Sequence, residues 1–268
     1  TLKQMYNLFW FCKKCQIPFD VYAFTNEYKL RTRTMEEIKN KINVHEVKTN
    51  QFNIPEEFSM LNLFTSKVRT AELNEQMKLI YRIASGFSHN FYSAEYSYPY
   101  ALGLSGTPLN EALVCLDGII PQFKQQNKLQ KVQCIILTDG EAHPLKRHKE
   151  VRRQPNTEPY LGYGQLGDWC YLRDRQTGMT YRFTGHWLNI TDVLLRDLRD
   201  KFIDVNFIGI RVLASRDAGA FIRTYCGYNG ELHDKVMKDW KKQRSFSIKT
   251  SGYHSYFGLS GNVLSSDS

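Results

Sequence analysis

The sequence has no apolar run long enough to cross a lipid bilayer. Its apolar runs are short, for example residues 134–137, whereas a membrane-spanning helix needs about 20 apolar residues. Residues 1–4 lead straight into an amphipathic segment, without the pattern of a secretory signal. We therefore expect no membrane partner and a soluble protein of the cytoplasm, which would be the host cytoplasm if the protein is viral.

Motifs of the common catalytic classes are also missing. There is no Gly-x-x-x-x-Gly-Lys-Ser/Thr loop, which excludes a P-loop ATPase, and no Gly-x-Ser-x-Gly nucleophile elbow. Glu141 and His143 closely follow Asp139, and a metal-dependent hydrolase uses such groups as base and ligand. No second carboxylate cluster accompanies them. We therefore interpret them as polar loop residues and predict no catalytic residue.

Cysteine is sparse and lacks the spacing of a metal site. Only Cys12 and Cys15 lie close together, and no second pair completes a four-ligand zinc site. Most of the other cysteines lie in apolar segments, where a free thiol behaves as a small hydrophobe. We predict inert, mostly buried thiols and a reducing compartment.

The sequence does contain an excess of positive charge. Lys and Arg number 36 against 27 Asp and Glu, which gives a net charge of +9 and a pI near 9.2. Such a charge favours contact with polyanions, including nucleic acid. The densest basic run is Lys146–Lys149, continued by Arg152 and Arg153. This run is either a solvated loop or a contact for an acidic or nucleic-acid partner.

Apolar periodicity predicts alternating strands and helices. Residues 2–15 form a helix that is apolar on nearly every face, which predicts burial on more than one side. Another helix begins at Pro108 after a capping Thr107, and a third is capped by Asn189 or Thr191. Further helices are predicted over residues 69–84, 216–226 and 231–243, and strands over 19–24, 58–64, 132–137, 204–212 and part of 245–259.

This alternation predicts an α/β fold with a doubly wound, mostly parallel sheet and helices on both faces. The continuous apolar strand 132–137 is expected at the centre of the sheet. Residues 1–142 and 189–259 would form the α/β domain. Residues 143–188 would be an insertion with a β-hairpin that turns near residues 176–178. Residues 28–57 are predicted as a surface excursion, 85–100 as an aromatic loop and 260–268 as a disordered tail.

Two short segments contain the candidate ligand-binding residues. Gly106-Thr107-Pro108 precedes a helix, and Thr138-Asp139-Gly140 ends the apolar strand. In doubly wound sheets, ligands gather at the carboxyl ends of the strands. We expect Thr107 and Asp139 to reach the same crevice. The alternative interpretation is a helix-capping threonine and a turn aspartate.

Together these segments resemble the second and third parts of the metal-ion-dependent adhesion site of von Willebrand factor A domains. The resemblance implies that Thr107 and Asp139 hold Mg²⁺ or Mn²⁺, whose ligands are oxygens. The first part of the family's motif, Asp-x-Ser-x-Ser, is not present. We expect that part and the first strand of the sheet to precede Thr1, so that the metal site in this chain is incomplete. Partner-binding residues near the site would be Ser105, Gly106, Gly140, Glu141, Lys146 and Arg147.

The phrase Asp-Gly-Glu-Ala-His-Pro-Leu at residues 139–145 gives a closer resemblance to phage and bacterial proteins similar to the von Willebrand A subunit of cobaltochelatase. That resemblance implies an AAA+ ATPase as protein partner. The sequence therefore favours a non-catalytic, cation-dependent protein-interaction module. The alternatives are a basic RNA- or DNA-binding protein with the same fold, and a structural component of a larger, viral assembly.

Overall fold

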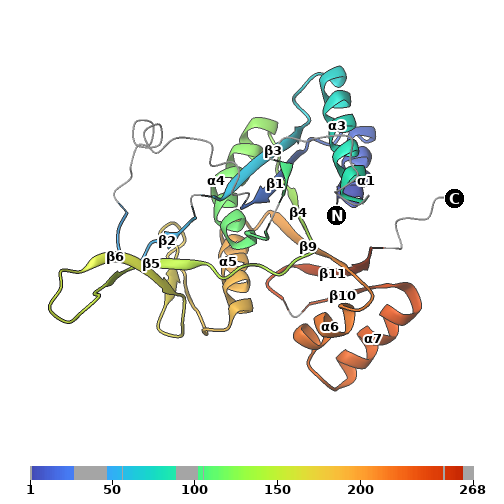
Figure 1. Ribbon diagram of the computed structural model, residues 1–268. Helices are drawn as coiled ribbons and strands as arrows, with labels where there is room; N and C mark the ends of the chain where they lie inside the picture. Colours follow the sequence, from blue (N-terminus) through green and yellow to red (C-terminus); the bar gives the residue numbers. More distant parts are fainter. Residues whose placement is uncertain are drawn as a thin grey trace.

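The computed structural model describes residues 2–26, 47–55, 57–88, 102–104, 106–249 and 251–261, and in these ranges the chain is a mixed α/β protein (Figure 1). The helices are α1 (Leu2–Lys14), α3 (Thr70–Ser88), α4 (Leu109–Asn127), α5 (Trp187–Lys201), α6 (Ala218–Cys226) and α7 (Glu231–Gln243). The strands are β1 (Asp20–Thr25), β2 (Phe52–Asn53), β3 (Ser59–Thr65), β4 (Val132–Thr138), β5 (Lys146–Val151), β6 (Tyr160–Gln165), β7 (Tyr171–Arg173), β8 (Thr180–Arg182), β9 (Val205–Leu213), β10 (Ser245–Ile248) and β11 (Ser255–Ser260).

The main sheet has four strands in the order β10-β11-β9-β4. Strands β11, β9 and β4 run parallel, and β10 is antiparallel to β11. Strand β4 therefore ends this sheet, whereas the sequence predicted it at the centre. Among the described residues nothing pairs with its free edge, and Ile135 is 42% exposed. The central position belongs to β9, where buried residues alternate with half-buried ones.

A second, smaller layer is formed by the antiparallel pair β1 and β3 with helices α1 and α3. Phe9 of α1 packs on Phe19 and Phe64, with ring centroids 5.0 and 4.9 Å apart. Helix α1 buries one side only, because Trp10 and Phe11 are 40% and 58% exposed. The prediction that this helix is buried on more than one side was wrong. Within the described residues α3 is the one helix that packs along it.

The larger core lies between the main sheet and helices α4 to α7. Gly209, in the middle of β9, is held between aromatic rings. A Cβ atom at this position would lie 2.6 Å from Tyr256 Cδ2 and 2.8 Å from Tyr253 Cε2. The close approach of Tyr253 and Tyr256 to the central strand therefore requires glycine there.

Residues 143–188 hold four short strands. The predicted hairpin is present as β7 and β8, with Gly178 at a positive φ of 74° in its turn. The basic run Lys146–Lys149 lies in strand β5, which corrects its interpretation as a loop. Strand β5 pairs with β6 and with β2. Strand β2 comes from the segment predicted as a surface excursion, of which residues 28–46 lie outside the described residues.

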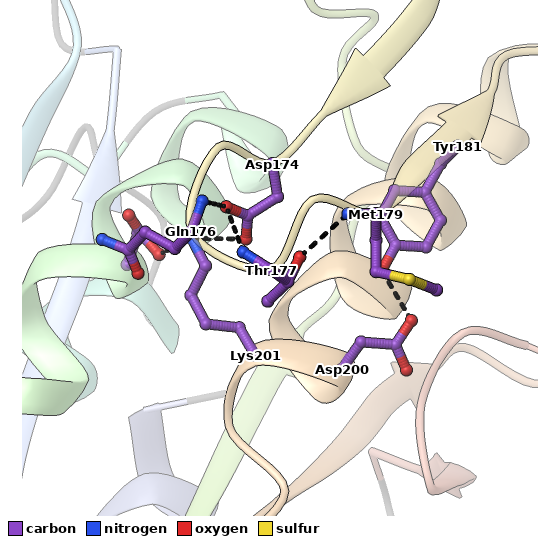
Figure 2. A network of polar contacts seen from close by, with 8 residues as sticks. Asp174, Gln176, Thr177, Met179, Tyr181, Asp200 and Lys201 are labelled. Carbon is purple, nitrogen blue, oxygen red and sulfur yellow. Dashed lines mark hydrogen bonds and ion pairs between the residues drawn. The ribbon is translucent and has the colours of Figure 1, made fainter.

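A polar network fastens the β7–β8 hairpin to α5 (Figure 2). The Asp174 carboxylate accepts from the backbone N–H of Gln176 at 2.6 Å and forms an ion pair with Lys201 Nζ at 2.9 Å. The Tyr181 hydroxyl donates to Asp200 at 2.5 Å. Burial raises the pKa of Asp174, but Lys201 and the backbone donors outweigh it and hold the pKa below its ordinary value. The turn is thus anchored by an ionised carboxylate.

The side chains predicted to cap α4 and α5 do not cap these helices. Helix α4 begins at Leu109, with Pro108 in the N-cap position and no side-chain cap. Helix α5 begins at Trp187, where His186 Nδ1 accepts from the N–H of Leu188 at 3.3 Å. Thr191 instead donates to Asn110 Oδ1 at 2.8 Å. Asn189 Oδ1 accepts from the N–H of Thr184 at 2.7 Å, so neither predicted residue caps α5.

Three further predictions concern the C-terminal tail, the aromatic loop and membrane-spanning helices. Ser260, expected in a disordered tail, is buried in β11, whereas residues 262–268 lie outside the described residues. The aromatic loop predicted over residues 85–100 lies outside them from residue 89 onward, and residues 85–88 belong to α3. In the described ranges, no helix combines the length and apolarity needed to cross a membrane.

Candidate functional site

The carboxyl end of β4 is tied directly to the start of α4. After Thr138 the chain turns through Asp139 and Gly140 and returns toward the loop that precedes α4. The Thr107 carbonyl accepts from the N–H of His143 at 3.2 Å and from the N–H of Leu109 at 2.8 Å. The bond from His143 joins the loop after β4 to the segment before α4.

The Thr107 side chain packs on Gly140. A Cβ atom built on Gly140 would lie far inside van der Waals contact with Thr107 Oγ1, and 3.4 Å from Thr107 Cβ. The hydroxyl therefore occupies the space next to the glycine that follows Asp139. Asp139 itself is exposed. The structure thus brings the predicted pair, Thr107 and Asp139, to one end of the main sheet.

The other predicted site residues divide into near and distant ones. Gly106 has a φ of 75° and lies against His143 and Asn26 at the end of β1. Ser105 lies outside the described residues. Glu141 forms an ion pair of 3.3 Å with Arg211 of β9.

Lys146 and Arg147 belong to a different part of the protein. Both lie on β5, where they pair with β2 and β6. Arg147 Nη1 donates to Asn50 Oδ1 at 2.9 Å. Their described partners therefore belong to the β2–β5–β6 sheet and not to the loop that holds Thr107 and Asp139.

Two buried polar residues in the first turn of α4 were not predicted from the sequence. Asn110 is fully buried, and its amide donates to the His143 carbonyl at 2.7 Å. Glu111 is 3% exposed, and its Oε2 atom has no hydrogen-bond partner among the described residues. Burial raises the pKa of Glu111, and nearby His143 opposes that shift. The sequence signal that could have revealed them is a pair of polar residues at the start of an otherwise apolar helix.

The donor chemistry of this end of the sheet fits a hard cation. Thr107 and Asp139 offer a hydroxyl and a carboxylate, and Mg²⁺ is commonly held by one or two protein carboxylates and water. Buried oxygens without described partners, Glu111 Oε2 and Asn26 Oδ1, belong to residues around the same loops. The described residues contain no group of three or more His, Cys, Asp or Glu side chains arranged to hold a metal. This donor set does not fit a structural zinc site.

A small pocket with both polar and apolar lining residues adjoins Gly140. It lies between the loop after β4, the start of α5 and the loop before β11, and its cavity volume is about 20 Å³. Burial raises the pKa of both carboxyl groups in its lining, Glu141 and Asp192. The remaining lining residues are Leu109, Thr138, Gly140, Ala142, Leu188, Thr191, Tyr225, Ser251, Tyr253 and Tyr256.

The candidate site draws on segments that are far apart in the sequence. Asn26 follows β1, Thr107 precedes α4, and Asp139 follows β4. Such convergence at the carboxyl ends of strands is typical of binding crevices in α/β proteins. No protein family, curated protein or solved structure matches this chain.

Proposed function

We propose that this protein is a non-catalytic interaction module that binds a partner protein through a divalent cation, Mg²⁺ or Mn²⁺. Thr107 and Asp139 would supply the cation ligands of this chain. The observation that carries the proposal is the packing of Thr107 Oγ1 on Gly140, next to Asp139. It supports the proposal because an oxygen donor from each motif segment then lies at the same end of the main sheet.

The surroundings of the two donors support cation binding. A bound Mg²⁺ would supply open coordination positions, where a carboxylate of the partner can replace water. The chain's own residues orient the donors: the Thr107 backbone is held by His143 and Leu109. Buried Glu111 would accept hydrogen bonds from water in the second coordination shell.

We further infer that the fold contains a single doubly wound sheet, similar to that of a von Willebrand factor A domain. Among the described residues β4 pairs only with β9, and β1 pairs only with β3. Both strands thus keep one free edge, and α4 contacts β1 while it also packs on α5. A further strand placed between β4 and β1 would join the two sheets and cover Ile135. The first strand of the resemblance would occupy this position.

The cation proposal is tested by calorimetric titration of the whole protein with Mg²⁺ and with Mn²⁺. We expect binding that Asp139→Ala abolishes and Thr107→Val weakens at least tenfold. Asp217→Ala removes an exposed carboxylate at the start of α6 and serves as the matched control. Unchanged cation affinity in Asp139→Ala would refute the proposal, as would the absence of any binding to the native protein.

Partner binding is tested separately from cation binding. The resemblance to cobaltochelatase-like proteins suggests an AAA+ ATPase as the partner class. Pull-down from the source cell with and without EDTA should show an ATPase subunit that is lost with EDTA and with Asp139→Ala. An ATPase retained by both treatments contradicts a cation-mediated contact.

A further inference from the structure

Strands β5 and β6 and the turn between them form a projecting ribbon, here called the basic arm (residues 146–165). Strand β2 pairs with Lys146 and Arg147, and the residues just before it exchange backbone hydrogen bonds with His148, so the arm beyond His148 is a two-stranded antiparallel ribbon. In Figure 1 the arm extends to the left, away from β9, β10 and β11. Most of its side chains are exposed.

The basic arm carries positive charge that the described residues do not neutralise. Residues 146–165 include five Lys or Arg and two Glu, a net charge of +3 without histidine. Lys146, Lys149, Arg152 and Arg153 are all exposed, and none forms an ion pair with another described residue. An extended stripe of such cations attracts a polyanion.

Exposed aromatic rings accompany these charges. Tyr163 is 61% exposed and lies opposite His148, with ring centroids 5.6 Å apart. Tyr160 is 47% exposed and has the Arg153 guanidinium 5.6 Å from its ring centroid. The exposed aromatics continue beyond the arm at Trp169, which is 88% exposed. Large aromatic residues exposed in this way often mark a binding surface.

The pairing register gives each face of the arm one tyrosine and at least one basic side chain. Residues directly opposite each other in an antiparallel pair point to the same face, and neighbours along a strand alternate. Lys149 and Tyr160 therefore share one face, and Lys146 and Tyr163 share the other.

Two glycines on one face of the arm make room for neighbouring side chains. The Lys149 side chain lies across Gly164, since a Cβ atom there would be 2.8 Å from Lys149 Cδ. Gly162 lies beneath Val151 in the same way, with 2.8 Å to Val151 Cγ2. The two glycines therefore let the Lys149 and Val151 side chains lie flat across the strand on the face opposite Tyr163.

We propose that the basic arm binds single-stranded nucleic acid. Tyr160 and Tyr163 would stack on bases, and Lys146, Lys149, Arg152 and Arg153 would contact phosphates. Alternating rings and cations match a polymer that alternates π faces with phosphates, whereas an acidic protein surface would use the charges alone. Since stacking accepts every base, binding would show little sequence preference. This inference does not rest on the cation site.

The test is fluorescence anisotropy of the whole protein with labelled, mixed-sequence DNA and RNA single strands of about 12 nucleotides. We expect binding that weakens with salt, with a slope of log K against log [salt] of about −0.7 for each phosphate contacted. Duplex DNA of the same sequence should bind at least tenfold more weakly, because its bases are already stacked. Comparison of the DNA and RNA strands identifies the preferred sugar.

Variants separate stacking from charge. Tyr160→Ala or Tyr163→Ala should each weaken binding by about 5- to 100-fold, from the loss of one stacked base. Lys149→Gln with Arg153→Gln should reduce the salt slope by about 1.4. Tyr228→Ala, at a tyrosine that is 77% exposed outside the arm, and Lys242→Gln, on α7, are the matched controls.

Several outcomes would overturn the proposal. These are no binding to any single strand, equal or tighter binding to duplex DNA, or arm variants that behave as the controls do. Equal affinity for polyglutamate would show that charge alone is recognised, which also rejects it. Asp139→Ala should retain nucleic-acid binding, so failure of the cation proposal and failure of this one are distinguishable.

Discussion

At the scale of single residues, the candidate site depends on close packing between Thr107 and Gly140. The glycine is thus required by a contact and not by a turn, since the residue does not have a positive φ. Such a requirement can be recognised only from the tertiary structure, which brings the two segments into contact.

Gly140→Ala is predicted to destabilise the protein by about 1–3 kcal/mol, because the new methyl group would collide with Thr107 Oγ1. Thr107→Ala should relieve the collision, so the double variant should be more stable than the sum of the single effects predicts. Urea denaturation of the four proteins measures this coupling. Gly118→Ala, in a part of α4 with nothing within 4 Å of the added carbon, is the control. Additive effects of Gly140→Ala and Thr107→Ala would contradict the prediction.

At the scale of elements, a cluster of ionisable groups joins the β7–β8 hairpin to helices α4 and α5. Lys201 contacts Asp117 at 2.5 Å and Asp174 at 2.9 Å. Desolvation and the neighbouring charge of Asp174 raise the pKa of Asp197 to about 6, with Asp117 acting in the same direction and Lys201 opposing them. The hairpin is therefore held through Asp174, which shares the Lys201 ammonium with Asp117 of α4, while Asp197 lies close enough to feel these charges.

Asp197 should make the stability of the protein depend on pH. Its pKa is about 6 in the folded protein and about 3.9 in an unfolded chain, so the folded state binds the proton more tightly. The stabilising contribution is complete below about pH 4 and is lost as the pH rises through 6. Asp197→Asn should therefore be more stabilising at pH 8 than at pH 4. The change that it causes in the free energy of unfolding should be more positive at pH 8 by about 1–2 kcal/mol. This figure is reduced from the full linkage value because the carboxyl group is only half-buried.

Urea denaturation of native protein and Asp197→Asn at the two pH values makes the comparison. Asp217→Asn, at an exposed carboxyl group, supplies the control. An effect of Asp197→Asn that is the same at both pH values would show that this carboxyl group ionises normally.

At the scale of the whole molecule, the described residues bury two separate hydrophobic clusters. The smaller one joins α1, α3, β1 and β3 around Phe9, Phe64 and Met77. The larger one joins the main sheet with α4 to α7. Since β1 and β4 are not paired among the described residues, few backbone hydrogen bonds are available to couple the two clusters. Local opening of the smaller layer is expected to precede global unfolding.

Phe64→Ala, in the smaller cluster, is predicted to speed amide exchange in α1, β1, β3 and α3 far more than in β9. The side chain is 1% exposed, and its removal should destabilise that layer by about 3–5 kcal/mol. Hydrogen-exchange mass spectrometry reports each segment. Phe207→Ala, which removes a fully buried ring from β9, is the matched variant and should speed exchange in the main sheet. Equal acceleration of β9 by Phe64→Ala would show that the two clusters unfold as one.

The sequence by itself determined the type of most elements. The apolar spacing of residues 73, 77, 80 and 84 predicted α3; the first three side chains are buried and Ala84 is half-buried. The apolar runs predicted β4 and β9 within a residue of their ends, and the turn residues predicted the β7–β8 hairpin. Periodicity is sufficient for these features because each depends on local backbone geometry and on one buried face.

Only the tertiary structure decided which elements lie side by side. It placed β4 at the end of the main sheet, made a strand of Lys146–Lys149, and left Trp10 and Phe11 of α1 exposed. It also brought Thr107 onto Gly140 and buried Glu111 beside the same loops. The physical reason is that a local pattern specifies a face to be buried, whereas the partner of that face and the pairing of a strand edge are set by distant segments.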